Sequence, residues 1–376
     1  MDKIVCGLSN PLSGRYAPQG REAFNGLSLW ARDVNESGGV YLPGARKRAH
    51  IRLIHYDNRS EGEPTKLQVE RLITHDGVDI LIGPYSSGLT LEACGVADSH
   101  NKTLWNHGGS SDELFNRGYG CIVSAITSAS GYFKGILDMI SVVDTKSKAL
   151  AVIYASDSGF SSEVAAGALR YGQEIGFQAE EFKYTSGESD FQCLLTHIKR
   201  FCPDVMLCAG RMDDDIALAK QILRNGVEAG AIGLVAAGVN DFHESLRHCA
   251  EGFIGPSQWE PRLDTETDIG PRSSEFESRY KDSYGRAPDY PAAQAYNIGL
   301  VIERCIAEAA TLDGRMLKEA AGRLRFRTFY GDFGIDPLTG AQTAHRMVTV
   351  QWQGGKKLII YPPEAATGDL IYPVNR

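Results

Sequence analysis

The amino-acid sequence predicts an α/β fold in which parallel sheets are flanked by helices. Short apolar runs alternate with longer amphipathic segments along most of the chain. This alternation is typical of strand–helix–strand units, in which each helix returns the chain to the start of the next parallel strand. The alternation also runs in two series, the second beginning at Ala149. The sequence therefore predicts two similar halves.

The first series is expected to contain four strands with helices between them. The strands are expected at Ile4–Ser9, Ile51–Tyr56, Asp79–Gly83 and Thr103–Asn106. The helices are expected at Glu22–Asn35, through Lys66, Val69 and Leu72, and at Ser87–His100. In the first of these helices, apolar residues recur at the three- and four-residue spacing of one buried face: Ala23, Leu27, Trp30 and Val34.

The second series repeats this order and is followed by a C-terminal part. Its strands are expected at Ala149–Tyr154, Gln178–Tyr184, Val205–Ala209 and Ala231–Ala236. Its helices are expected at Ser161–Ile175, Phe191–Arg200 and Asp214–Asn225. A long helix, Ala292–Thr311, precedes a hairpin over Met347–Tyr361 that turns at Gln353-Gly354-Gly355. Because the C-terminal part returns to structure already begun, we expect lobes built from discontinuous segments, with crossings that act as a hinge.

The composition excludes several classes of protein. A chain of 376 residues with 43% hydrophobic residues is long enough for two domains with separate cores. The net charge is −8 and Lys and Arg are scattered, which argues against a nucleic-acid or anionic-membrane surface. No window approaches the length of apolar sequence that spans a bilayer. The eight cysteines form no C-x-x-C pair and no Cys/His cluster at zinc spacing, so we expect buried thiols or one incidental disulfide, and no metal or cofactor.

The start of the chain leaves its compartment open. Met1-Asp2-Lys3-Ile4-Val5 runs directly into a strand-like stretch, without a charged segment followed by an apolar one. The pattern of a signal peptide is therefore not visible. Either the protein is cytoplasmic, or the sequence is a mature form with a new initiator methionine.

Turns that follow strands are the first places to look for a ligand site. In open α/β sheets, ligands lie beyond the carboxyl ends of the strands, where helices begin and backbone N–H groups point outward. The turn Asn10–Gly20 follows the first strand and offers glycines and polar side chains, among them Tyr16 and Gln19. It contains neither G-x-x-x-x-G-K-[ST] nor G-x-G-x-x-G, so a nucleotide is not indicated.

Two further turns carry hydroxyl groups and helix-start amides. Gly83–Gly88 follows the third strand and offers Tyr85, Ser86 and Ser87, which suit a carboxylate, an amide or another group rich in acceptors. The same serines are also good helix caps, and both roles can coexist.

The turn Asn106–Glu113 follows the next strand in the same way and offers Asn106, Gly108 and Ser110. We expect it to meet the Gly83–Gly88 turn at one rim of the sheet.

Catalysis is not indicated by any motif. The chain has no G-x-S-x-G elbow and no H-E-x-x-H. His107 is near serines, but a lone histidine in a turn is expected to be structural or a ligand contact rather than a base. The three carboxylates Asp213–Asp215 stand at an expected helix start, where we expect them to be solvated and favoured by the helix dipole rather than to bind a metal. The sequence therefore predicts a protein that is not an enzyme.

Several of these segments together resemble the type I periplasmic binding proteins, specifically the branched-chain amino acid and amide group that includes the leucine/isoleucine/valine-binding protein. The similarity runs over nearly the whole chain. The segments that carry it are Leu12-Ser13-Gly14 with Ala17 and Gly20, Asn35-Glu36-Ser37-Gly38-Gly39, Asp57-Asn58, Gly83-Pro84-Tyr85-Ser86-Ser87, and Tyr330-Gly331-Asp332-Phe333.

The resemblance implies two Rossmann-like lobes that are joined by three hinge crossings and close on a ligand in the cleft between them. Lobe 1 is then expected to comprise residues 1–121 and 250–327, and lobe 2 residues 122–249 and 328–376. In family members that bind amino acids, the first lobe holds the α-carboxylate. The matching positions here are Ser87, Gly108 and Ser110, so an oxygen-rich head group is expected.

The second lobe departs from the family pattern. The acidic residue that receives the ligand ammonium is replaced by Ala237-Gly238, and an acidic position near the first crossing by Thr127. An ammonium group would lose its carboxylate partner, which is costly for a charge taken from water. An aromatic position is kept as Phe160, and Arg211 stands where some amino-acid binders have an aromatic residue. We therefore expect a ligand other than a free α-amino acid.

The residues that replace the ammonium site favour a small organic acid, an aromatic one among them, or an amide. An apolar wall is expected from Tyr16, Tyr85, Phe160 and Trp105, although each aromatic residue could instead pack in a core. Arg211 could pair with a ligand carboxylate, or with Asp213 or Asp214.

The leading hypothesis is a monomeric extracytoplasmic receptor of an ABC importer, whose partners are a small solute and a membrane permease. Three alternatives stay open: a ligand-sensing regulatory protein of the same fold, a branched-chain amino acid binder, and an enzyme on a doubly wound scaffold.

Overall fold

The computed structural model describes residues 3–263 and 266–374 and divides into two compact units. Unit 1 comprises Met1–Ser128 and Pro261–Arg346, and unit 2 comprises Ala129–Glu260 and Met347–Arg376. The chain therefore passes from one unit to the other three times.

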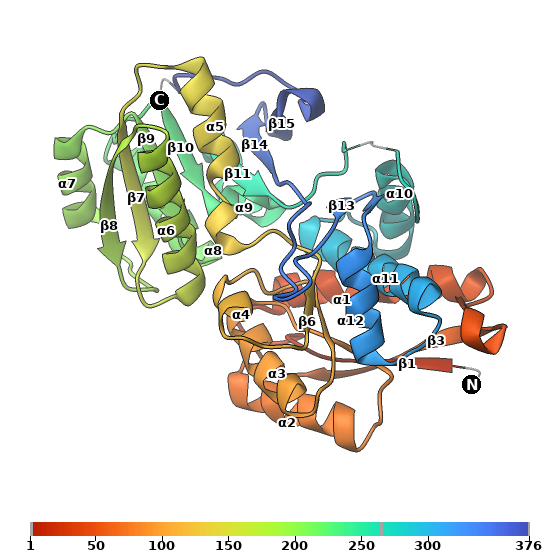
Figure 1. Cartoon of the computed structure of the whole chain (residues 1–376). Coiled ribbons are helices and arrows are strands. Elements are labelled where there is room, and N and C mark those ends of the chain that lie inside the picture. Colours follow the sequence, from red (N-terminus) through yellow and green to blue (C-terminus); the bar gives the residue numbers. More distant parts are fainter. Residues whose placement is uncertain (1–2, 264–265, 375–376) are drawn as a thin grey trace. The chain divides into compact units, whose positions relative to one another are not determined.

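Unit 1 contains a six-stranded sheet in the order β2-β3-β1-β4-β5-β6 (Figure 1). The strands are β1 (Lys3–Asn10), β2 (Val40–Leu42), β3 (Lys47–Asp57), β4 (Ile80–Ile82), β5 (Leu104–Asn106) and β6 (Ile122–Ser124). Only β2 is antiparallel to its neighbour. The carboxyl ends of the other five strands therefore lie at the same edge of the sheet, which we call the unit 1 rim.

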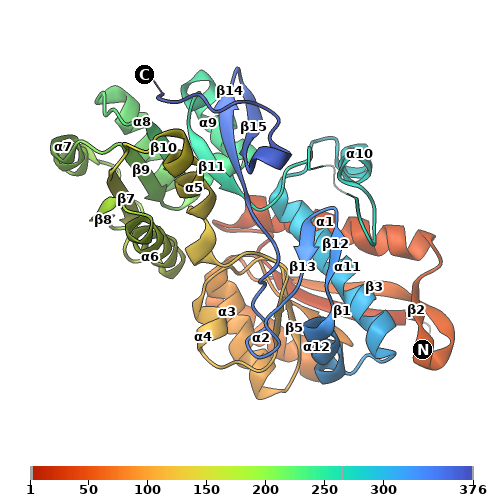
Figure 2. The same ribbon diagram turned by 45° about the horizontal axis from the view of Figure 1, so that its top comes forward.

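Helices cover both faces of the unit 1 sheet. They are α1 (Ala17–Glu36), α2 (Gly62–Thr74), α3 (Ser87–Ser99), α4 (Glu113–Asn116), α10 (Ser273–Tyr284), α11 (Tyr290–Ala309) and α12 (Gly314–Arg323). α1 and α11 pack along each other (Figure 2). Their backbones lie so close together that a Cβ at Gly26 would collide with the Ala292 carbonyl oxygen. The absence of a side chain at Gly26 is what allows this approach. A small antiparallel ribbon, β12 (Phe326–Thr328) with β13 (Gly331–Phe333), completes the unit.

Unit 2 contains a seven-stranded sheet in the order β15-β14-β11-β10-β9-β7-β8. The strands are β7 (Ala149–Ala155), β8 (Gln178–Tyr184), β9 (Val205–Ala209), β10 (Ala231–Leu234), β11 (Ile254–Ser257), β14 (Val348–Gln353) and β15 (Lys356–Tyr361). β7 to β11 are parallel, and β14 and β15 form the expected antiparallel hairpin. The carboxyl ends of the parallel strands form the unit 2 rim.

The core of unit 2 lies on both faces of this sheet. Its helices are α5 (Lys134–Val143), α6 (Gly159–Glu174), α7 (Gln192–Phe201), α8 (Met212–Arg224) and α9 (Asn240–Leu246). Alternate residues of β7 point to opposite faces, as the two-residue period of a strand requires. Leu150 and Val152 pack with α5 and α6, whereas Ala151 and Ile153 pack with α7, α8 and α9.

The parallel-sheet architecture predicted from the sequence is confirmed, with differences at short elements. The strands β2, β6, β11, β12 and β13 were not expected, because three or four residues are too few to show a period. The helices α5, α10 and α12, of 10, 12 and 10 residues, were not predicted either. The expected strand Ala231–Ala236 ends at Leu234, because a 3₁₀ turn begins at Val235.

The three passages between the units lie later in the chain than the expected boundaries after residues 121, 249 and 327. β6 pairs with β5 and so belongs to unit 1, and β11 pairs with β10 and β14 in unit 2. The β12–β13 ribbon keeps the chain in unit 1 as far as Arg346.

Candidate functional site

Three turns meet at the unit 1 rim, as the parallel strands dictate. The Tyr85 amide donates to Asn10 Oδ1 at 3.3 Å, which joins the turn after β4 to the end of β1. The Ser86 amide donates to the Gly108 carbonyl at 3.4 Å, which joins it to the turn after β5. The sequence-predicted residues Tyr85, Ser86 and Gly108 are therefore brought together.

Asn106 organises the turn after β5 from within. Its fully buried side chain accepts from the amides of Gly108 and Gly109 and donates to the Gly109 carbonyl and to Ser124 Oγ. Every polar atom of the amide group is thus used inside the protein. Asn106 shapes the rim and does not present its side chain at the surface of unit 1.

Gly108 is required by the close approach of two turns. A Cβ at this position would lie 2.6 Å from the Pro84 carbonyl oxygen and 2.7 Å from Tyr85 Cα. Real Cβ atoms do not approach backbone this closely, so any side chain would push the turns apart.

The Ser87 hydroxyl is the best-positioned donor at this rim. Its oxygen accepts from the amides of Ser110 and Ser111, each at 3.1 Å. With both lone pairs engaged, the hydroxyl can interact with a further group only by donating its proton. Such a donor is suited to a carboxylate or a carbonyl oxygen.

The start of α3 adds backbone donors. Ser86 caps the helix, with its side chain accepting from the Leu89 amide and its backbone at a positive φ of 97°. Among the residues that the structure describes, the amides of Ser87 and Gly88 have no acceptor. An anion placed there would also be favoured by the helix dipole.

The turn after β1 is held by Asp57. The Asp57 carboxylate accepts from the amides of Leu12 and Ser13 and from the Ser13 hydroxyl. Partial burial raises the pKa of Asp57, but these hydrogen bonds and one from the Arg59 amide lower it below its ordinary value. The predicted residues Tyr16 and Gln19 follow this turn at the start of α1, and both are half-buried.

Thr127 has a partner that the sequence did not indicate. Thr127 Oγ1 shares a hydrogen bond of 2.7 Å with His345 Nδ1, and the His345 ring stacks on Tyr330 with ring centroids 4.7 Å apart. These residues are separated by 218 positions in the chain, so no local pattern could reveal the pair.

His107 and Trp105 are core residues of unit 1. Both side chains are buried, and burial lowers the pKa of His107 to about 4. His107 is therefore neutral near pH 7 and too deep to act as a base on a bound molecule. The hypothesis that Trp105 contributes to an apolar wall is wrong, since only about one hundredth of the residue is exposed.

Phe160 and Arg211 follow strands at the unit 2 rim. Phe160 begins α6 and packs its ring edge-on against Tyr132 at 5.3 Å. Arg211 is the residue before α8, and no carboxylate of the described residues lies within ion-pair distance of it. The alternative in which Arg211 pairs with Asp213 or Asp214 is therefore not realised in this structure.

Ala237 lies in the 3₁₀ turn after β10. It is buried, and its carbonyl accepts from Trp352 Nε1 at 2.9 Å. The turn contributes backbone rather than an accessible side chain.

The three carboxylates at the start of α8 differ from expectation. Asp213 is exposed, but Asp214 and Asp215 are buried. The prediction of a fully solvated acidic cluster is wrong for these two, because both point inward to accept from the backbone amides of Gly187 and Ala236, respectively.

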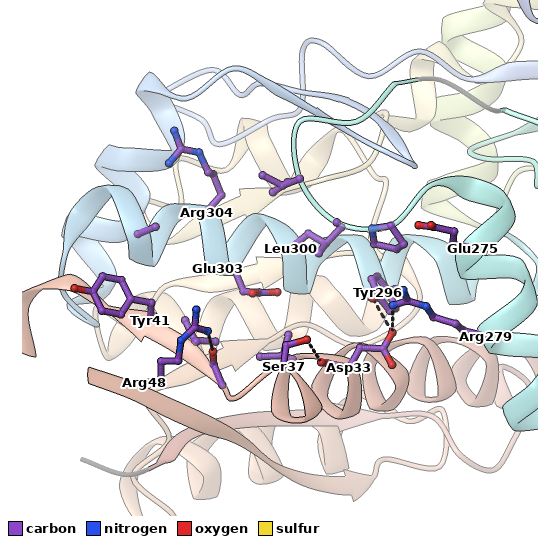
Figure 3. A pocket seen from close by; sticks show the side chains of 17 residues that line it. Asp33, Ser37, Tyr41, Arg48, Glu275, Arg279, Tyr296, Leu300, Glu303 and Arg304 are labelled. Atoms are coloured by element: carbon purple, nitrogen blue, oxygen red, sulfur yellow. Dashed lines mark hydrogen bonds and ion pairs between the residues drawn. The ribbon is translucent and has the colours of Figure 1, made fainter. Parts of the chain in front are cut away.

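A cavity of about 480 Å³ lies elsewhere in unit 1, where α1, α10 and α11 meet near the beginning of β3 (Figure 3). None of the predicted ligand contacts lines it. Several of its polar groups bond to each other: Asp33 accepts from Arg279 and from the Tyr296 hydroxyl, and Arg48 donates to the Gly39 carbonyl. These groups are already satisfied, so we place the candidate site at the rims.

The cysteines, the apolar helices and the possible metal ligands can also be compared with the sequence-based expectations. All eight cysteines are described and all are free thiols, five of them buried, so the incidental disulfide is absent. No described helix combines the length and the apolar character needed to cross a bilayer. No group of three or more His, Cys, Asp or Glu side chains within residues 3–263 and 266–374 could hold a metal.

Two discontinuous α/β units, with parallel-dominated sheets and helices on both faces, define the fold class of the type I periplasmic binding proteins. A family model described as periplasmic binding protein matches residues 3–357, and the chain belongs to this family. The resemblance inferred from the sequence is thereby confirmed.

Individual relatives agree on the fold and differ in the ligand. The chain is 26% identical over 391 residues to the Leu/Ile/Val-binding protein homolog 7 of Brucella abortus (strain 2308), covering 98% of this chain and 94% of that protein. The branched-chain amino acid binding protein LivJ of Streptococcus pneumoniae, solved with isoleucine, superposes with a TM-score of 0.79 at 21% identity, covering 99% of this chain and 100% of that one. A solute-binding protein of Rhodopseudomonas palustris BisB5, solved with 3,4-dihydroxybenzoic acid, also gives 0.79, at 20% identity and with 100% and 99% covered. The fold alone therefore leaves the class of solute open.

Proposed function

We propose that the chain is the extracytoplasmic receptor of an ABC importer, and that it binds a small organic acid, aromatic acids included, or the corresponding amide. The observation that carries the proposal is the Ser87 hydroxyl, whose oxygen accepts from the Ser110 and Ser111 amides and whose proton is left to donate. The Ser87 and Gly88 amides add donors at the start of α3. Together they form a site for an oxygen-rich head group.

A free α-amino acid is a poorer candidate because its ammonium would lack a partner. The turn Val235–Gly238 contains no acidic side chain, and the Thr127 hydroxyl is already bonded to His345. A buried ammonium without a carboxylate would be strongly destabilised. Arg211 instead supplies a positive charge that forms no ion pair with a described carboxylate, although after the Ser186 hydrogen bonds it helps to lower the pKa of Asp157. We therefore assign Arg211 to a second acidic or carbonyl group of the solute.

The proposal includes closure of the two units on the solute and docking of the closed form to a membrane permease, without chemical turnover. Binding energy then drives a population shift between open and closed forms. Small-angle scattering checks this step: the radius of gyration should fall when a stabilising solute is added. An unchanged radius at saturation would refute closure.

A thermal-shift screen of paired compounds tests the ligand class. Benzoate, hydroxybenzoates and aliphatic monocarboxylates are compared with their neutral amides and with leucine and isoleucine, all at equal concentration. A compound that binds the folded state raises the unfolding midpoint. We expect the largest rise from an acid, because the donors at Ser87 and the charge of Arg211 suit carboxylate oxygens. A larger rise from leucine or isoleucine than from every acid and amide would overturn the proposed ligand class.

A further inference from the structure

Three of the buried oxygen atoms of unit 2 that have no hydrogen-bond partner among the described residues lie around one backbone position. They are Tyr184 Oη, Asp214 Oδ2 and Asp215 Oδ1. The exposed fractions of these residues are 8%, 4% and 0%, respectively. Leaving such groups unsatisfied costs free energy, so their presence in one place calls for an occupant.

The three residues surround the backbone of Gly210, the residue that follows β9. A Cβ at Gly210 would collide with Tyr184 Oη, would lie 2.5 Å from Asp215 Oδ1, and would lie 3.1 Å from Asp214 Cβ. The phenol from the end of β8 and the carboxyls from the first turn of α8 therefore converge on one side of a residue that must be glycine.

The carboxyl groups are anchored, so they cannot turn away. Asp214 Oδ1 accepts from the Gly187 amide at 2.8 Å, and Asp215 Oδ2 accepts from the Ala236 amide at 2.9 Å. Asp214 is fixed from the loop after β8 and Asp215 from the turn after β10, and the Gly210 backbone amide also acts on Asp215 by lowering its pKa. The second oxygen of each is held in the interior.

The two carboxyls form no ion pair with a described residue, although hydrogen bonds to Ser186 and the charge of Arg211, the residue after Gly210, lower the pKa of the neighbouring Asp157. No Lys, Arg or His of the described residues lies within ion-pair distance of Asp214 or Asp215. The other acidic group near the phenol is Asp157, and the Cys208 thiol is buried close by. Burial raises the pKa of Asp215 to about 8, and burial raises the pKa of Tyr184 well above its ordinary value, so the phenol stays neutral. Two buried carboxyls without a cation are strongly disfavoured.

We propose that Tyr184, Asp214 and Asp215 bind one Na⁺ ion in the interior of unit 2. Hard cations prefer oxygen ligands, and the three groups without a hydrogen-bond partner around Gly210 are carboxylate and phenol oxygens. A site of two carboxylates and a phenol suits a hard monovalent ion better than a soft transition metal, which prefers thiolate ligands, because burial raises the pKa of the nearby Cys208 thiol well above its ordinary value. The ion would also restrict the motion of the Gly210 backbone and so of the next residue, Arg211.

A proton is the competing occupant. A protonated Asp215 would need no ion and could donate to Tyr184 or Asp214. The two occupants are separable because Na⁺ binding requires the ionised carboxyl, whereas protonation excludes the ion.

The test compares thermal unfolding in NaCl and in choline chloride at equal ionic strength, at about pH 9, where protons compete least with a cation for carboxylate oxygens. We expect NaCl to raise the unfolding midpoint of the wild type by about 2 °C or more. Tyr184→Phe keeps the ring that packs on Phe191 and removes one ligand oxygen, and should abolish most of the difference. Asp215→Asn should abolish it as well.

The matched control is Asp213→Asn, which neutralises the exposed acid of the same helix turn and should retain the full NaCl effect. Equal midpoints in the two salts for the wild type would overturn the proposal. It would also be overturned if both variants kept the NaCl effect, or if Ca²⁺ stabilised the wild type and Na⁺ did not.

Discussion

The two rims differ in how their buried polar groups are satisfied. At the unit 1 rim, the polar groups of three turns bond to one another, from Asn10 through Ser86 to Ser110, and what is left over is a small set of donors. At the unit 2 rim, Arg211 forms no ion pair with a described carboxylate, and the buried Asp214 and Asp215 form none with a described Lys, Arg or His. Under the proposals above, internal hydrogen bonds of unit 1 position the donors for the solute, whereas the charged groups of unit 2 are balanced by the solute and an ion.

The two rims should therefore respond differently to amino-acid substitutions. Substitutions in the unit 1 network should reduce both stability and binding, because the same hydrogen bonds hold the turns together and position the remaining donors. Substitutions at the unit 2 rim should show effects that depend on pH, ions or solute.

The largest expected effect is a dependence of unit 2 stability on pH that arises from Asp215. Because burial raises the folded pKa of Asp215 from its ordinary value of 3.8 to about 8, the folded protein keeps a proton that the unfolded chain releases between these values. This contribution is fully present below about pH 4 and is lost as pH rises toward 8, by at most about 1.4 kcal/mol per pH unit.

The measurement is urea unfolding of wild type and Asp215→Asn between pH 4 and pH 8 in choline chloride. The difference between the two proteins isolates the Asp215 contribution from Glu22 and Glu303, whose pKa values burial raises to about 7. Parallel curves would contradict the account.

Asn106→Ala should destabilise unit 1 by about 3 kcal/mol, since several buried groups lose their partners at once. The same variant should lose solute binding because the rim turn is no longer held. Asn116→Ala, an exposed asparagine at the end of α4, is the control. Denaturant unfolding of the two variants checks the difference, and similar small losses in both would refute the organising role of Asn106.

Gly108→Ala should cost about 1 to 3 kcal/mol by overpacking, because the added methyl would meet backbone of Pro84 and Tyr85. Gly88→Ala is the matched comparison in the neighbouring turn, since nothing lies within 4 Å of its added Cβ. We expect Gly88→Ala to be neutral or slightly stabilising in thermal unfolding. A neutral Gly108→Ala would show that the two turns are not tightly apposed.

The smallest expected effect on stability is that of Arg211→Met, within about 0.5 kcal/mol, because no ion pair is lost. Its affinity for the best acid of the screen should nevertheless fall, whereas its affinity for the matching amide should change little. Calorimetric titration with both compounds checks this selectivity. Equal losses for acid and amide would argue that Arg211 does not pair with a carboxylate.

Most of the fold could be predicted from the sequence because long elements carry a clear period. The strand Ile4–Ser9 and the helix Ala292–Thr311 were each placed within two residues of the observed bounds. The carboxyl-end rule then located the turns of unit 1 correctly, since parallel strands force Tyr85 and Gly108 to one edge.

The rest could not be predicted because it depends on contacts between distant residues. Thr127 bonds to His345 across 218 positions, and the depth of Asp215 depends on an amide of the turn after β10. Helix-start carboxylates are ordinarily solvated, and only the packed structure shows that two of the three point inward.

Isothermal titration of the best acid from the screen into wild type and Ser87→Ala tests the central claim most directly. The account predicts that removal of this one hydroxyl weakens binding by about 1 to 3 kcal/mol, roughly 5- to 150-fold, while the variant stays folded. Unchanged affinity in Ser87→Ala would contradict the assignment of the unit 1 rim as the place where the acidic group is held.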